Sequence, residues 1–222
     1  MKKFFFLWPL FLIFLSTYNY YGKENSDSSF FSIKEIKIQG IKNSSREDLE
    51  RKFDKIRKKN IIFLRKKNVE KFIKNIDFVN SLRIKKLYPD KIIITVIEDL
   101  PIGIYVDDSG KKHILLENNK IIKNHNYELE SLPEVYGEGA PEKFSYFYSN
   151  LQKTGLSLKL VRQFNYYDIN RWDVLLKDKK LVKLPTENYE ESITKFLEIY
   201  EKSSFKKFKI FDFRIKNEII MR

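Results

Sequence analysis

The longest apolar run of the chain lies in its first 21 residues. It extends from Phe4 to Leu15 and continues less strictly, through several tyrosines, to Tyr21. A transmembrane helix needs roughly 20 apolar residues to cross about 30 Å of hydrocarbon, and tyrosines suit the interfacial ends of such a helix. A cleaved signal peptide needs small residues before its cut site. Bulky tyrosines occupy that place here, so the pattern favours an uncleaved transmembrane signal anchor over residues 4–21.

The charges that flank this run predict its orientation. Lys2 and Lys3 precede it and favour a cytoplasmic N-terminus, because cytoplasmic flanks carry an excess of Lys and Arg. Residues 1–3 would then be a cytoplasmic stub and residues 22–31 a polar linker, with the bulk of a single-pass protein outside the cytoplasm. The residues expected to span the membrane are Phe4, Leu7, Trp8, Leu10, Phe11, Leu12, Ile13, Phe14 and Leu15.

Residues 32–99 show the periodicities of a small α+β domain. Apolar residues alternate with polar ones in some stretches and recur at helical spacing in others. The predicted elements are a strand around Ile36–Ile38, helices around Leu49–Ile56 and Val69–Ile76, and strands over Val79–Leu87 and Lys91–Glu98. The order β-α-α-β-β predicts a sheet with two helices on one face, because that arrangement buries both helical stripes.

Residues 100–222 predict a second, mixed β-rich domain with two helices packed on a sheet. Short strands separated by turn residues run to Gly137. Pro141 suits the first position of a helix, and Asn188 followed by Glu191 suits the start of another. The chain is predicted to close with a strand pair over residues 208–215 and 218–222.

Composition excludes several kinds of chemistry. The 222 residues include no Cys and only two His, His113 and His125, so thiol catalysis and sites built from Cys or clustered His are excluded. Gly-rich phosphate loops and known hydrolase motifs are also missing. The adjacent carboxylates of Asp107 and Asp108 would point apart on a strand. We therefore expect no enzyme activity, no cofactor, no metal and no small-molecule substrate.

The chain is basic, with 43 Lys and Arg against 30 Asp and Glu and a net charge of +13. Lysine is spread along nearly the whole chain, and no nucleic-acid-binding module accompanies it. We expect a solvated lysine surface and no nucleic-acid partner. Attraction to an anionic membrane surface is a natural side effect of such charge.

Several segments of the first domain resemble the POTRA domain of the FtsQ/DivIB cell-division proteins. The matching segments are Asn60-Ile61-Ile62-Phe63, Phe78-Val79, Pro89, and the run Ile92–Glu98 followed by Pro101. Each is loose alone, and their order and spacing carry the resemblance. In the second domain Leu132–Gly137, Arg171-Trp172 and the closing FDFRIKNEIIMR extend it.

The chain also departs from the family pattern at four places. A turn glycine is missing at Asp178-Lys179-Lys180, and Pro185 stands where Gly is usual. Ile215 replaces a Tyr and Glu218 replaces a Gly, so the final turn is expected to be built differently.

The resemblance implies a non-enzymatic organiser of the division complex in the bacterial inner membrane, with its bulk in the periplasm at the septum. It implies binding of FtsB- and FtsL-like proteins by the second domain, partly by strand addition at its C-terminal edge. The residues implied in partner binding are Arg214, Ile215, Asn217, Ile219, Ile220, Met221 and, more weakly, Arg171. For Arg214 an intramolecular salt bridge with Asp212 stays open as an alternative role.

A second interpretation is a POTRA-containing envelope assembly factor that acts in outer-membrane protein biogenesis. Proteins of that class carry a long region of alternating strands after their POTRA repeats, for which 222 residues leave no room. The division protein is therefore the leading hypothesis.

Overall fold

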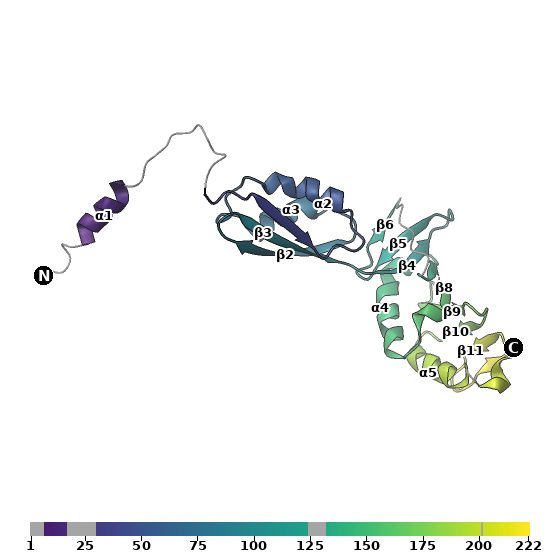
Figure 1. Ribbon diagram of the computed structural model, residues 1–222. Coiled ribbons are helices and arrows are strands. Elements are labelled where there is room, and N and C mark those ends of the chain that lie inside the picture. Colours follow the sequence, from purple (N-terminus) through teal and green to yellow (C-terminus); the bar gives the residue numbers. More distant parts are fainter. Residues whose placement is uncertain (1–6, 17–29, 124–131, 201) are drawn as a thin grey trace.

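The computed structural model describes residues 7–16, 30–123, 132–200 and 202–222 (Figure 1). Helix α1 (Leu7–Ser16) has ten residues. Among the described residues, no helix combines the length and apolar character needed to cross a membrane. Of the predicted anchor over residues 4–21, the structure describes only α1. Phe4, the stub 1–3, residues 17–21 and the linker up to residue 29 lie outside the described ranges.

The first domain has the predicted β-α-α-β-β order. Its elements are β1 (Glu35–Gln39), α2 (Arg46–Phe53), η2 (Asp54–Ile56), α3 (Lys66–Ile73), β2 (Val79–Leu87) and β3 (Lys91–Glu98). The strands lie in the order β1-β3-β2, with β1 parallel and β2 antiparallel to β3. Helices α2 and α3 cover one face of this sheet (Figure 1), and the apolar side chains Leu49, Val69 and Ile94 are buried between the layers.

The loop from β1 to α2 is held by the carboxylate of Glu98 at the end of β3. It accepts hydrogen bonds from the backbone N–H groups of Lys42, Asn43 and Ser44 at 3.1, 2.9 and 3.0 Å. Partial burial raises the pKa of Glu98, but these hydrogen bonds outweigh it, and the pKa lies below its ordinary value. Glu98 is therefore a fold residue, which orients the start of α2.

Replacing Glu98 with Ala is expected to lower the free energy of unfolding by about 2 kcal/mol at neutral pH, because three backbone donors lose their acceptor. Since the folded pKa lies below the unfolded one, the carboxylate stabilises the protein above the unfolded pKa. That contribution disappears as the pH falls through the folded pKa, so the variant should lose less stability on acidification. Urea unfolding at several pH values measures both effects. Glu47→Ala, at an exposed carboxylate of α2, is the control, and equal behaviour of the two variants would contradict the assignment.

The second domain is a nine-stranded mixed sheet with two helices on one face (Figure 1). Its strands lie in the order β12-β11-β10-β9-β8-β7-β4-β5-β6. The elements are β4 (Pro101–Val106), β5 (Lys112–Leu116), β6 (Ile121–Ile122), β7 (Glu134–Tyr136), α4 (Ala140–Lys153), η3 (Leu158–Leu160), β8 (Val161–Tyr167), β9 (Arg171–Leu176), β10 (Leu181–Lys183), α5 (Tyr189–Tyr200), η4 (Ser203–Phe205), β11 (Ile210–Asp212) and β12 (Ile220–Met221). The α+β class and the two helices on a sheet are as predicted.

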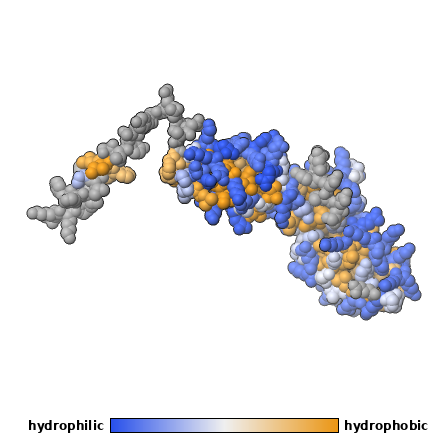
Figure 2. All heavy atoms as spheres, viewed as in Figure 1, coloured by the Kyte–Doolittle hydropathy of each residue, from blue (hydrophilic) through white to orange (hydrophobic). Residues whose placement is uncertain are grey.

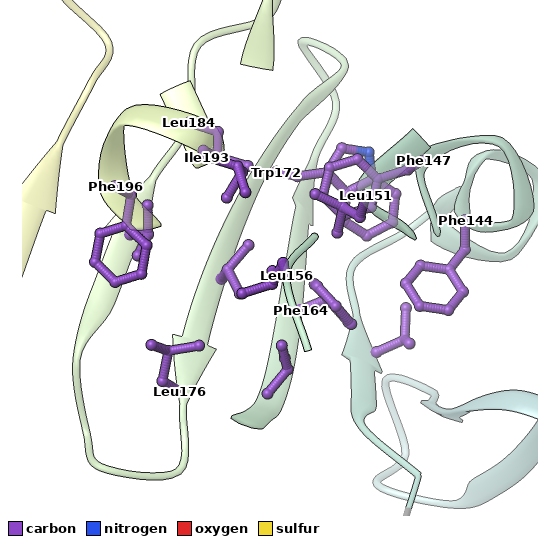
Figure 3. Packing of buried hydrophobic residues seen from close by; sticks show 14 of the residues in the cluster. Phe144, Phe147, Leu151, Leu156, Phe164, Trp172, Leu176, Leu184, Ile193 and Phe196 are labelled. Atoms are coloured by element: carbon purple, nitrogen blue, oxygen red, sulfur yellow. The ribbon is translucent and has the colours of Figure 1, made fainter. Parts of the chain in front are cut away.

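Aromatic side chains fill the space between this sheet and its helices. Figure 3 shows Phe144 and Phe147 of α4 facing Phe164 of β8 and Trp172 of β9. Phe147 and Trp172 are stacked, with ring centroids 4.5 Å apart and planes 9° apart. Trp172 is 5% exposed, so this tryptophan is a core residue, as its place on an alternating strand indicated.

The hydrophobic cores of both domains are formed by residues that follow α1 in the sequence. Two clusters form the domain cores, and a third joins Phe78 to Ile104, Ile114, Leu116 and Ile122 at the junction. In the described part of the chain, all buried hydrophobic side chains lie between Ile33 and Phe213. Residues 30–222 therefore contain every core side chain that the structure describes and form a folding unit without the N-terminal segment.

The predicted closing strands were too long. The pair expected over 208–215 and 218–222 is shortened to β11 and β12. Phe213 donates its N–H to Lys183 of β10 at 2.9 Å, and the backbone N–H of Arg214 bonds to the carboxylate of Asp212 at 3.1 Å. The chain leaves the ladder at that point because local partners satisfy its backbone groups.

Candidate partner-binding edge

Strand β12 forms one end of the second sheet. It pairs with β11 in antiparallel register, with Phe211 opposite Met221 and Asp212 opposite Ile220. Ile210 and Arg222 exchange hydrogen bonds at 3.0 and 3.1 Å. No other strand of the described residues lies beyond β12. The terminal ribbon is therefore an open edge of the sheet.

The register decides which backbone groups of β12 point outward. In an antiparallel ladder, hydrogen-bonded pairs alternate with pairs whose N–H and C=O groups point away from each other. Because Ile210 and Arg222 form a hydrogen-bonded pair, Ile220 faces β11 and Met221 faces away from it. Ile219 shares the direction of Met221. Two residues thus offer main-chain donors and acceptors at the edge, which is what strand addition by a partner requires.

Arg214 is held by the carboxylate of Asp212 at the start of the final turn. Its Nε and Nη2 atoms donate to the two oxygens of Asp212 at 2.8 and 2.6 Å. The hydrogen bonds from Arg214 lower the pKa of Asp212, although burial opposes them. The Arg214 side chain is still 43% exposed. The intramolecular salt bridge considered for Arg214 is thus present, and part of the side chain stays accessible to a partner.

Asn217 adopts a left-handed backbone conformation in the final turn. Its φ of +62° lies in the left-handed region, which Asn tolerates better than most residues. Glu218, at the glycine position, donates its N–H to Ile215 at 3.2 Å. The final turn thus has its left-handed residue at Asn217, and it leaves Ile215 50% exposed.

A groove of about 510 Å³ lies between this turn and the start of α5. The turn contributes Phe213–Ile219, and the helix side contributes Asn188, Glu191, Ser192 and Lys195. Its lining includes the basic residues Arg214, Lys216 and Lys195 and the acidic residues Glu191 and Glu218. The groove adjoins β12, so a strand added at the edge would have side-chain space beside it.

The helix-free face of the same sheet carries a row of charged side chains. Register pairs Asp173 with Lys183, Lys183 with Asp212, and Asp212 with Ile220, so the row leads to the edge strand. Asp173 is 2% exposed, and burial raises its pKa against the opposing charge of Arg171.

Arg171 lies within this row and is less accessible than the sequence suggested. Its Nε atom is 3.7 Å from Oδ1 of Asp173, and its side chain is 14% exposed. The guanidinium also lies 4.1 Å from the ring centroid of Tyr167. A role for Arg171 in meeting an acidic partner stays a prediction, and the geometry assigns it first to holding Asp173.

Sequence reasoning missed the charged row and the α5 wall of the groove. The signal for the row is Asp173 itself, a carboxylate between two apolar residues, Trp172 and Val174, that point to the opposite face of the strand. No pattern along the chain indicated the groove, because it depends on how the final turn meets α5.

The remaining ionisable residues considered from the sequence are His113, Asp107, Asp108 and His125. His113 is buried and lies 2.8 Å from the carboxylate of Asp107, whose pKa is lowered by hydrogen bonds from Ser109 and His113. Asp108 lies on the neighbouring exposed turn. The described residues contain no group of three or more side chains placed to hold a metal ion, and His125 lies outside them.

Comparison with known protein families assigns both domains. A profile described as "POTRA domain, FtsQ-type" matches residues 31–98. A second, described as "Cell division protein FtsQ/DivIB, C-terminal", matches residues 104–214. The second match includes Arg171 and Arg214 and ends before the turn and β12.

Individual relatives agree with these profiles. The chain is 25% identical over 194 residues to the cell division protein FtsQ of Rickettsia bellii, and the aligned region covers 85% of this chain and 71% of that protein. It is 20% identical over 174 residues to FtsQ of Rhizobium meliloti, covering 78% and 56%. It is 23% identical over 114 residues to DivIB of Clostridium tetani, covering 51% and 42%. The chain thus spans between about two fifths and about seven tenths of these relatives.

The fold and the open edge define a protein with a POTRA domain followed by a β-rich domain suited to strand addition. The profile matches make this class specific. The chain belongs to the FtsQ/DivIB family of cell-division proteins.

Proposed function

We propose that this chain is a non-enzymatic scaffold of the division complex, which docks partner proteins at the septum by adding one of their strands to β12. The outward N–H and C=O groups of Ile219 and Met221 carry this proposal. Each backbone hydrogen bond that a partner forms there has no competitor among the described residues. A main-chain contact of this kind gives affinity, and neighbouring pockets give specificity.

Specificity would come from the two surfaces that flank the edge. On one face the partner strand would lie beside the groove with Arg214 and Ile215 on its wall. On the other it would meet the row that ends at Asp212 and Ile220. Because the Arg214 side chain is 43% exposed beside Asp212, a carboxylate of the partner could accept further hydrogen bonds from its guanidinium. The proposed partners are the extracytoplasmic parts of FtsB- and FtsL-like proteins.

The proposed location follows from the N-terminal run. A single transmembrane anchor over residues 4–21, with Lys2 and Lys3 in the cytoplasm, would place both domains in the periplasm. Tethering would keep the domains near other membrane-bound division proteins and raise their effective concentration. The alternative role in outer-membrane protein biogenesis is not favoured, because the second domain matches the C-terminal domain of FtsQ/DivIB.

The test measures binding of residues 30–222 to the extracytoplasmic segment of an FtsB-like protein from the same organism by titration calorimetry. Met221→Pro removes one outward donor and is expected to weaken binding at least about tenfold, since the lost hydrogen bond leaves a buried partner group unpaired. Met221→Ala keeps the N–H and is the matched control, with a smaller loss expected.

Proline at Ile220 is expected to act differently. The N–H of Ile220 faces β11, so Ile220→Pro should lower stability through lost pairing with Asp212. Circular dichroism and urea unfolding separate that effect from partner binding. An unchanged affinity in folded Met221→Pro and Ile219→Pro would show that β12 is not the docking strand.

A further inference from the structure

Three segments meet at the end of the POTRA domain that lies away from the second domain. Phe31 accepts a hydrogen bond from the N–H of Ile61 at 2.9 Å, and Lys86 Nζ donates to the carbonyl of Ile62 at 3.0 Å. The segments are residues 30–34, the loop 57–65, and the turn 85–91 between β2 and β3. We call this the proximal end, because the chain enters the domain there from α1 (Figure 1). The second domain joins the opposite end, where Asp99 donates its N–H to Phe78.

The proximal end exposes a cluster of large apolar side chains. Its members are Phe30 (71% exposed), Ile62 (44%), Phe63 (77%), Leu87 (38%) and Tyr88 (60%). These are all of the large hydrophobic residues that are exposed within residues 30–99. Single exposed apolar residues are ordinary, but a local gathering of aromatic ones indicates a contact surface.

Basic residues surround this cluster. Residues 32–99 hold 19 Lys and Arg against 10 Asp and Glu, whereas residues 100–222 hold 21 against 18. The excess positive charge is therefore larger in the POTRA domain than in the second domain. Figure 2 shows hydrophobic surface among hydrophilic residues on the POTRA domain. Arg65, Lys67 and Lys85 are exposed at or beside the proximal end and form no ion pair with described residues.

The adjoining chain limits what this end can reach. Eight residues, 22–29, separate the predicted anchor from Phe30. At no more than about 3.6 Å per residue, they span at most about 29 Å. If the anchor crosses the membrane, the proximal end stays within that distance of the bilayer. Aromatic side chains with Lys and Arg around them are the combination that binds an anionic membrane interface.

We propose that the proximal end docks on the anionic lipid surface, with Phe63 and Tyr88 entering the headgroup region and Arg65 and Lys67 contacting lipid phosphates. This docking rests on the membrane tether of the proposed function. It fixes the orientation of the POTRA domain and holds the second domain, with its β12 edge, away from the bilayer. Lipid binding would then account for both the exposed apolar cluster and the excess of Lys and Arg in the POTRA domain.

The test is co-sedimentation of residues 30–222 with vesicles of phosphatidylglycerol and phosphatidylcholine in equal parts. The fragment lacks the anchor, so its behaviour is independent of whether residues 4–21 span a membrane and of whether β12 binds a partner. We expect partitioning onto these vesicles that weakens with salt. Phe63→Ser combined with Tyr88→Ser should lower the partition coefficient about tenfold, because both side chains lose apolar burial.

Matched controls come from the second domain. Tyr146→Ser removes an aromatic side chain that is 73% exposed on α4 and should leave partitioning unchanged. Arg65→Glu with Lys67→Glu should weaken binding more than about tenfold. Lys177→Glu with Lys206→Glu, which changes the net charge equally at exposed sites, should have a much smaller effect.

Circular dichroism checks that each variant is folded. Because all of the replaced side chains are exposed, we expect the replacements to leave the fold intact. Failure of the wild-type fragment to sediment with the vesicles would overturn the proposal and leave the apolar cluster to a protein partner. Equal binding to phosphatidylcholine alone, or equal losses in the proximal and control variants, would overturn it as well.

Discussion

Replacing Phe147 with Ala is expected to lower the free energy of unfolding of the second domain by about 3–5 kcal/mol. Phe147 is 1% exposed and stacks on Trp172, and its ring also meets that of Phe164 edge to face at 5.7 Å. Removing the ring opens a cavity between α4 and the sheet, and the surrounding aromatic rings are too rigid to fill it. Urea unfolding followed by tryptophan fluorescence measures the change, because Trp172 reports directly on this contact.

Tyr146→Ala is the control for Phe147→Ala. It truncates the preceding residue of the same helix, whose side chain is 73% exposed, and should change stability by no more than about 0.5 kcal/mol. A loss of less than about 1 kcal/mol for Phe147→Ala would mean that α4 is not packed on the sheet as described.

Replacing Gly137 with Ala is expected to destabilise the second domain by about 3 kcal/mol or more. Gly137 has a φ of +113°, which an L side chain rarely adopts, and a Cβ atom there would lie 2.4 Å from the carbonyl oxygen of Tyr166. Strain and overpacking each contribute about 1–3 kcal/mol. The neighbouring backbone belongs to β8, so relief of the clash would disturb the sheet.

Gly155→Ala separates the two contributions. Gly155 also has a positive φ, of +83°, but no atom lies within 4 Å of the Cβ position. Its replacement should therefore cost only the conformational strain, about 1 kcal/mol. Equal losses for the two variants in thermal or urea unfolding would show that the close approach to Tyr166 is not present in solution.

The elements of the first domain were predictable because each has a clean periodicity. The run from Lys91 to Glu98 is β3 over those same residues, and Val79–Leu87 is β2. Ser45 caps α2 by accepting a hydrogen bond from the N–H of Asp48 at 3.2 Å. Local hydrogen bonds and apolar spacing carry enough information for such elements.

The strand boundaries of the second domain were less predictable because they depend on tertiary contacts. Residues 158–160 form a 3₁₀ turn, and strand β8 begins only at Val161. The backbone N–H of Arg214 bonds to the carboxylate of Asp212 instead of extending the pair with β12. The identity of the neighbour, which no periodicity states, decides where each ladder stops.

The candidate sites, too, were predictable from the sequence only in part. The sequence and its family resemblance led to the C-terminal ribbon, but the outward direction of Ile219 and Met221 follows only from the register of β12 on β11. The segment Asn60-Ile61-Ile62-Phe63 carried part of the family resemblance, but the difference between buried Ile61 and exposed Phe63 follows from the packing of three distant segments. A shift of one residue in the register of β12 on β11 would exchange the backbone groups of β12 that face β11 with those that point outward.

The two proposed surfaces lie at opposite ends of residues 30–222. The proximal end belongs to the POTRA domain where the chain enters, and β12 belongs to the far side of the second domain (Figure 1). A protein that is held to the bilayer at one end can present its open strand to partners at a defined height. The account therefore predicts that lipid contact and partner contact are separable by mutation.

Amide hydrogen exchange of residues 30–222, with and without the FtsB-like segment, tests the central claim most directly. In the free protein the amides of Ile219 and Met221 should exchange quickly, and that of Ile220 more slowly because it is paired with β11. Bound partner should slow the exchange of Ile219 and Met221 by at least about tenfold, since new backbone hydrogen bonds protect them. Saturating partner that leaves both amides unprotected would contradict strand addition at this edge.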